Sequence, residues 1–128
     1  MSQFTTELVV EQIDERWWKL IEGFEYHVGE YPSDEIIIVP SGFITDFASV
    51  PKIFHGILPP TGPYKAAALV HDYCYATALY SKFKSDYIFL EGMTVLKVEP
   101  WKRDVMFIAV LFFGWWAWYK HRRRESRT

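Results

Sequence analysis

The stretch PYKAAALVHDYCYATALY, residues 63–80, decides the fold, because it predicts a helix that carries both apolar and ionisable side chains. Its run of alanines, followed by Leu69 and Val70, favours a helix. Pro63 stands where a proline fits the first helical turn. We therefore expect a helix over residues 64 to about 80.

The sequence before this helix has the period of β-strands. Three runs rich in β-branched or alternating apolar residues predict strands over 7–13, 16–28 and 35–39, and turn-forming residues separate them. A small antiparallel meander of about three strands fits this pattern. From residue 41 to 63, glycines, prolines and apolar side chains indicate a long loop that packs against the core.

Two more helices are expected after the first. Ser81 or Ser85 is a candidate N-cap for the second, which Glu99 and Pro100 close, and the third runs from about residue 101 to 121. The expected fold class is α+β: a small N-terminal antiparallel sheet, a long apolar loop and then three helices. We expect a single domain over 1–128, with 1–50 mainly β, 51–63 loop, 64–121 helical and 122–128 a basic tail.

Composition excludes several classes of protein. The chain has 128 residues, half of them hydrophobic, which suffices for one domain with its own core. A formal net charge of −2 does not indicate a nucleic-acid-binding protein, and the basic C-terminal residues are expected to form a solvated end. Cys74 is the only cysteine, so no intrachain disulfide can form. Residues 1–11 show no signal-peptide pattern, and we expect none.

The longest apolar run, residues 105–119, is shorter than the ~20 residues that a membrane-spanning helix needs. We therefore expect no integral membrane segment. A buried amphipathic helix is the favoured interpretation. The alternative is a helix on a membrane surface, with its aromatic side chains and basic end in contact with lipid.

His71, Tyr75 and Asp86 form the candidate catalytic site. Tyr75 lies one turn after His71 on the same helix face, and the short polar turn at 80–84 makes the next helix an antiparallel neighbour, so Asp86 can face His71. A carboxylate on one imidazole nitrogen fixes the tautomer and leaves the other nitrogen as a general base. Asp72 points about 100° away around the helix and is a candidate metal ligand.

Asp46 is the second candidate metal ligand. Within the segment TDFASVP, residues 45–51, its favoured role is structural, because an aspartate in a turn can bond backbone amides two residues further on. A His–Asp pair on a helix also has a structural alternative, a buried polar network. Cys74 is expected to be a small buried hydrophobe.

Several segments resemble an uncharacterised family, a domain of unknown function, that is encoded by tailed bacteriophages and prophages. They include VPSGFITDFASVP at residues 39–51, LPP at 58–60, and the pairs His71-Asp72 and Ser85-Asp86. The resemblance covers about residues 15–118. It implies a phage or prophage origin and, with it, a location in the infected bacterial cell or the virion.

The segment HDYCY, residues 71–75, more distantly resembles the His-Asp-x-x-Tyr helix of secreted phospholipases of the A-two class. That resemblance implies that His71 activates water, that Asp72 binds calcium, and that Tyr75 and Asp86 steady the histidine. The chain departs from those enzymes at Ala68, where they have a cysteine, and it has no recognisable glycine-rich calcium loop.

Two functions fit these residues. One is a metal-assisted lipid or ester hydrolase, with calcium as cofactor. The other is a non-catalytic phage virion or tail accessory protein, whose partners are phage structural proteins and in which the same residues form a structural network. The hydrolase is slightly favoured, because an ionisable triad in an apolar helix pair is costly to bury without a use.

Overall fold

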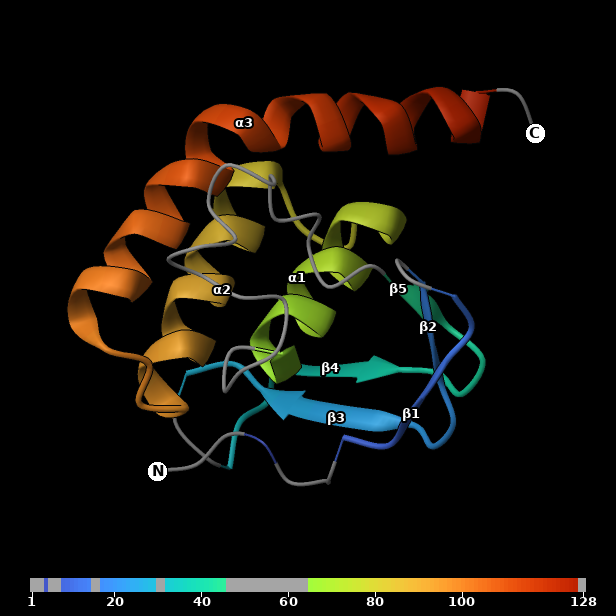
Figure 1. Ribbon diagram of the computed structural model, residues 1–128, viewed down its shortest axis with the longest axis horizontal. Helices are drawn as coiled ribbons and strands as arrows, with labels where there is room; N and C mark the ends of the chain where they lie inside the picture. Colours follow the sequence, from blue (N-terminus) through green and yellow to red (C-terminus); the bar gives the residue numbers. More distant parts are fainter. Residues whose placement is uncertain (1–3, 5–7, 15–16, 30–31, 46–64, 127–128) are drawn as a thin grey trace.

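The computed structural model describes residues 4, 8–14, 17–29, 32–45 and 65–126. Short strands come first in the chain and three helices follow, as Figure 1 shows. The predicted α+β class, with a small antiparallel N-terminal sheet and three helices after it, is confirmed. Most of the predicted long loop lies outside the described residues.

The described strands form two small antiparallel sheets rather than one meander. The first has the order β1 (Val10–Gln12), β2 (Trp18–Leu20) and β5 (Ile44–Thr45), and the second pairs β3 (Phe24–His27) with β4 (Ile36–Val39). The predicted strand over 16–28 is therefore two strands, and β5 occupies part of the predicted loop.

The reason for this split is the turn after β4, which brings the chain back to β2. Gly42 adopts a left-handed conformation with φ of 92°, which glycine tolerates at no steric cost, and its amide donates to the Leu20 carbonyl. The Leu20 amide in turn donates to the carbonyl of Phe43, and the Ser41 hydroxyl donates to the carbonyl of Ile21. These bonds pair β2 with β5 and free β3 to pair with β4.

The first two helices lie where the sequence predicted them, except at the C-terminal end of the first. Helix α1 (Lys65–Thr77) stops before the expected Tyr80, because Ala78 takes a left-handed conformation with φ of 52°. Helix α2 (Lys82–Val95) has Ser81 as its N-cap, and the Ser81 side chain accepts the Lys84 amide at 3.2 Å. Ser81 is thus the N-cap of the two candidates.

Helix α3 (Pro100–Ser126) is longer than expected, and it is bent (Figure 1). Figure 1 shows two arms: the first runs beside α2, and the second turns across the end of α1. We call residues 100–110 the first arm and residues 111–126 the second arm. The helix continues to Ser126, beyond its expected end at about residue 121 and into the predicted basic tail. None of the helices in the described part of the chain is both long and apolar enough to cross a bilayer.

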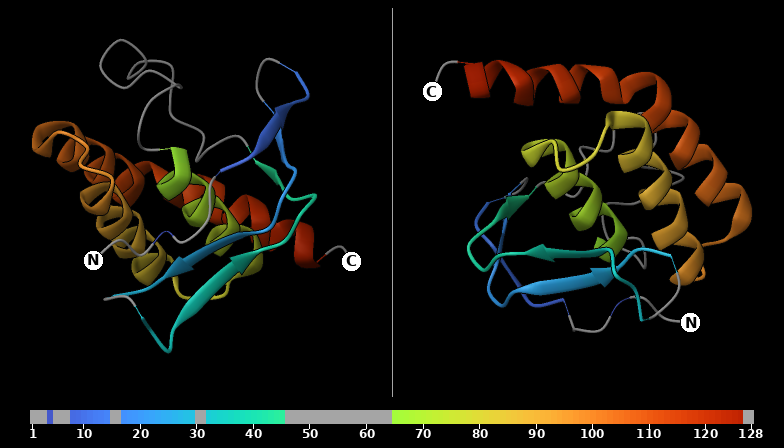
Figure 2. Two further views of the ribbon diagram at one scale, coloured as in Figure 1. Left: turned by 90° about the horizontal axis from the view of Figure 1, so that it is seen from below. Right: turned by 180° about the vertical axis from the view of Figure 1, so that it is seen from behind.

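Helix α1 lies at the centre of the fold. It contacts α2, α3, β4 and β5. The views in Figure 2 show the strands on one side of α1 and the other two helices away from the strands. Gly92 permits the close approach of α2, because a Cβ there would lie 2.9 Å from the Ala67 Cβ. The core draws on all three helices and both sheets: Leu20, Phe24, Tyr26, Ile37, Val39, Ala68, Leu69, Val70, Cys74, Ile88, Phe89, Met93 and Met106.

Candidate functional site: a buried carboxylate between three helices

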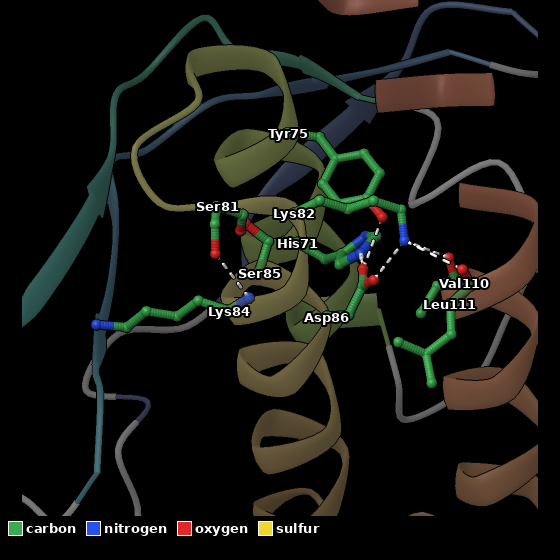
Figure 3. Close-up of polar contacts among 9 residues, drawn as sticks. All are labelled: His71, Tyr75, Ser81, Lys82, Lys84, Ser85, Asp86, Val110 and Leu111. Carbon is green, nitrogen blue, oxygen red and sulfur yellow. Dashed lines mark hydrogen bonds and ion pairs between the residues drawn. The ribbon is translucent and has the colours of Figure 1, made fainter. Parts of the chain in front are cut away.

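The Asp86 carboxylate is the centre of a buried polar cluster, drawn in Figure 3. His71 Nε2 lies 2.7 Å from Asp86 Oδ1, and the Tyr75 hydroxyl donates to the same oxygen at 2.6 Å. Lys82 Nζ donates to Asp86 Oδ2 at 2.7 Å. The structure therefore brings together His71, Tyr75 and Asp86, as the sequence predicted, and adds a lysine to them.

The lysine changes the electrostatics of the site. The Asp86 side chain is fully buried, and an isolated buried carboxylate would be very costly. Lys82 sits one helical turn before Asp86, is itself buried, and supplies the compensating positive charge. The charge of Asp86 is therefore balanced from within α2.

The orientation of His71 leaves one ring nitrogen available. A neutral imidazole that donates through Nε2 carries its lone pair on Nδ1. Nδ1 of His71 is buried and has no hydrogen-bond partner among the described residues. The ring packs against the rings of Tyr75 and Phe89, whose centroids are 4.2 and 4.8 Å away. A fixed imidazole with a free lone pair has the arrangement of a general base.

The protonation state of Tyr75 supports this arrangement. Burial, together with its bond to the Asp86 carboxylate, raises the pKa of the Tyr75 hydroxyl above its ordinary value. Tyr75 therefore stays protonated and serves Asp86 as a donor.

Lys82 also joins the site to α3. Its ammonium donates to the carbonyl oxygens of Val110 and Leu111, at 3.0 and 3.3 Å. A charged donor at these carbonyls competes with the backbone bonds of the next helical turn, which is a known cause of helix bending. Gly114 lies three residues after Leu111, and a Cβ there would lie 2.5 Å from the Tyr75 hydroxyl oxygen. The bend of α3 thus packs directly on the site.

Asp72 lies apart from this cluster, as its position on the helix predicted. Its Oδ1 is 3.8 Å from Nε2 of His121, in the second arm of α3. The neighbouring Arg122 donates to the carbonyls of Tyr75 and Ala76 at 2.6 and 3.2 Å, near the C-terminal end of α1. The prediction that the basic residues form a solvated end is wrong for Arg122, because α1 offers it carbonyls that it can bond.

The predicted metal pair of Asp72 and Asp46 stays a prediction. Asp46 lies outside the described residues, and within those residues no group of three or more His, Cys, Asp and Glu side chains is placed to hold an ion. An open hollow of about 460 Å³ is lined by Val28 and by residues of α2, and His71 is not among them. The His71 side chain itself is only 3% exposed.

The sequence analysis did not identify three residues that contribute to the site or to its contacts with α3. Lys82 had a readable signal, since a lysine and an aspartate four residues apart face each other on a helix. Gly114 and Arg122 had none, because their partners on α1 are distant in sequence and are reached only through the bend of α3. Cys74, by contrast, is buried as expected, and burial raises the pKa of its thiol to about 12.

The fold and the site together define a small α+β domain with an ionisable cluster between its helices. The chain belongs to the family described as "Protein of unknown function (DUF1353)", which matches residues 18–110. The match runs from β2 to the end of the first arm of α3 and includes all four side chains of the Asp86 cluster. It confirms the predicted relation to an uncharacterised family. No curated protein and no solved structure matches the chain at a significant level.

Proposed function

We propose that this protein is a small hydrolase of esters, with lipids as its substrate class and His71 as its general base. The observation that carries the proposal is Nδ1 of His71, which has no hydrogen-bond partner among the described residues. Leaving a buried polar atom without a partner costs about 1–3 kcal/mol, which a purely structural histidine could avoid. A water molecule or a substrate at Nδ1 would satisfy it.

The proposed reaction uses few groups. Nδ1 of His71 accepts a proton from water as the water oxygen forms a bond to the ester carbonyl carbon. The tetrahedral intermediate then collapses, the bond to the leaving alkoxide breaks, and that oxygen takes the proton back from His71. Asp86 holds the ring through Nε2 and stabilises the imidazolium while it exists. Tyr75 and Lys82 hold Asp86 and do not contact the substrate.

Calcium is part of this proposal, with Asp72 and Asp46 as candidate ligands. Calcium takes about six to eight oxygen ligands, and Asp72, which lies apart from the Asp86 cluster, would contribute one carboxylate. The described residues alone do not make up such a set, so no step above is routed through the ion.

The test is hydrolysis of a short-chain nitrophenyl ester and of phospholipid in mixed micelles, each with calcium and with a chelator. We expect His71→Gln to lower kcat by about 10²–10⁴-fold. The matched control is His27→Gln. His27 is also buried, but Ser33 donates to its Nδ1 and Glu25 lies 3.0 Å from its Nε2, so both ring nitrogens have partners. Equal activity in the two variants, with both folded, would rule out the general base.

A second candidate, a non-catalytic phage virion or tail accessory protein, is favoured by a different observation. The Asp86 carboxylate is satisfied by three donors, and Lys82 extends the cluster to α3, so the cluster is fit to fasten three helices together. The enclosed position of His71 agrees with this role. Mass spectrometry of purified phage particles tests it: the protein should be present in stoichiometric amounts, together with the structural proteins that it contacts.

Both candidates include a tailed-phage or prophage origin and action in the infected cell or the virion. The resemblance of residues 39–51 and of the His71-Asp72 helix supports this origin. Induction of a lysogen that carries the gene, followed by measurement of the protein, distinguishes a phage-cycle protein from one expressed without induction.

A further inference from the structure

The second arm of α3 presents an aromatic face to the outside. Phe112, Trp115, Trp116 and Tyr119 follow the spacing of one helix face, and each is exposed, Phe112 to 74% and Trp116 to 64%. Arg123 continues the same face and is also exposed. We call these five residues the outer stripe.

Most of the outer stripe faces away from the core, and it contacts the buried site through Trp115, whose ring centre lies 4.8 Å from the Lys82 ammonium. The opposite side of the same arm contributes the inward contacts, with Gly114 against Tyr75 and the Trp118 ring edge-on to Tyr75 at 5.3 Å. The arm is therefore apolar on both sides, although only one side is covered by the described part of this chain. Large contiguous exposed apolar patches of this kind mark contact surfaces.

The charges of the arm indicate what it contacts. From Val105 to Arg124 the sequence contains no aspartate or glutamate, while Lys120, Arg122, Arg123 and Arg124 are all basic. The Lys120 ammonium lies 5.0 Å from the centre of the Trp116 ring, so the charge stands at the edge of the aromatic surface. At the interface of an anionic bilayer, tryptophan and tyrosine side chains lie at the level of the headgroups, and lysine and arginine are attracted to the lipid charge.

We propose that the outer stripe docks the protein on a membrane surface that contains anionic lipids. The aromatic side chains would enter the headgroup region, and Lys120 and Arg123 would contact lipid phosphates. This inference rests on the proposed hydrolase, because it names the surface at which that enzyme would meet its lipid substrate. It agrees with the surface-helix alternative for residues 105–119 and assigns the contact to particular side chains.

A second copy of this chain is a less favourable partner for the outer stripe than an anionic membrane. The second arm carries four basic residues and one acidic residue, Glu125, so two second arms packed through this face would bring an excess of like charge together. An anionic surface has the opposite charge and favours the contact instead.

The experiment is sedimentation of the full chain with vesicles of phosphatidylcholine alone and of phosphatidylcholine with phosphatidylglycerol. The wild-type chain should partition onto the anionic vesicles, and salt should weaken the binding. The variant Phe112→Ser/Trp116→Ser should lose about tenfold or more in partitioning, and Lys120→Gln/Arg123→Gln about tenfold on anionic vesicles only. The matched control is Ile38→Ser, which removes an apolar side chain that is 61% exposed on β4 and should bind as the wild type does.

The outcomes separate this inference from the proposed hydrolase. Unchanged binding of Phe112→Ser/Trp116→Ser would overturn the docking surface, whatever the enzyme assay shows. A wild-type dimer that the same variant dissociates, without vesicle binding, would assign the stripe to a second copy and also overturn it. Hydrolysis of the soluble nitrophenyl ester reports on His71 independently, since that substrate needs no membrane.

Discussion

Replacing Lys82 with methionine tests the central electrostatic claim of the structure. The substitution keeps a long apolar side chain but removes the ammonium that pairs with Asp86 and bonds the carbonyls of Val110 and Leu111. Asp86 is then left fully buried with the donors His71 and Tyr75 but without a compensating charge. Such a change tests whether Lys82 is the counter-ion of the site.

The expected loss is large because the pair is buried. Removing one partner of a buried ion pair costs about 3–5 kcal/mol, and the two remaining donors place this case at about 3 kcal/mol. That is a large share of the about 5–15 kcal/mol by which a typical domain is stable. In urea unfolding followed by circular dichroism, the midpoint should fall by about 1–3 M.

The same helix supplies the control, Lys84→Met. Lys84 also holds a carboxylate at 2.7 Å, that of Glu35, but the two side chains are 45% and 46% exposed. An exposed pair is worth only about 0–1 kcal/mol. If Lys82→Met costs no more than Lys84→Met, the reasoning is refuted. If the buried charge is the cause, adding Asp86→Asn to Lys82→Met should recover part of the lost stability.

Three further predictions concern the surroundings of the site. Tyr75→Phe removes one donor to Asp86 and should lower the free energy of unfolding by about 1–2 kcal/mol in the same urea experiment; no change would mean that this bond is not formed. Gly114→Ala should cost about 1–3 kcal/mol despite the better helix propensity of alanine, because its Cβ would meet the Tyr75 hydroxyl. That cost should shrink in a Tyr75→Phe background, and a stabilised Gly114→Ala would contradict the close contact. Cys74, whose thiol pKa burial raises to about 12, should react with an aromatic disulfide reagent at about pH 8 only on unfolding, so fast labelling of the folded chain would contradict its burial.

How well a feature could be predicted from the sequence depends on how far apart in the chain its contacting residues lie. The helix around His71 was predictable because alanines and apolar residues recur locally, and the His71–Asp86 contact followed from the short turn between α1 and α2. The division of residues 16–28 into two strands was not, because it depends on bonds from the turn at 41–43 to β2. Strand pairing is a non-local choice, which local propensity does not decide.

Sequence alone therefore determined the α+β class, the three helices and the meeting of His71, Tyr75 and Asp86, because short-range periods and one short turn fix all of these. Only the tertiary structure decided the rest. The bend of α3 brings the carbonyl of Val110 to Lys82 and Arg122 to the end of α1. The same bend leaves the outer stripe on the surface. These contacts join residues about 28 to 47 positions apart, and no local pattern specifies them, since they depend on how α3 packs over the finished helix pair.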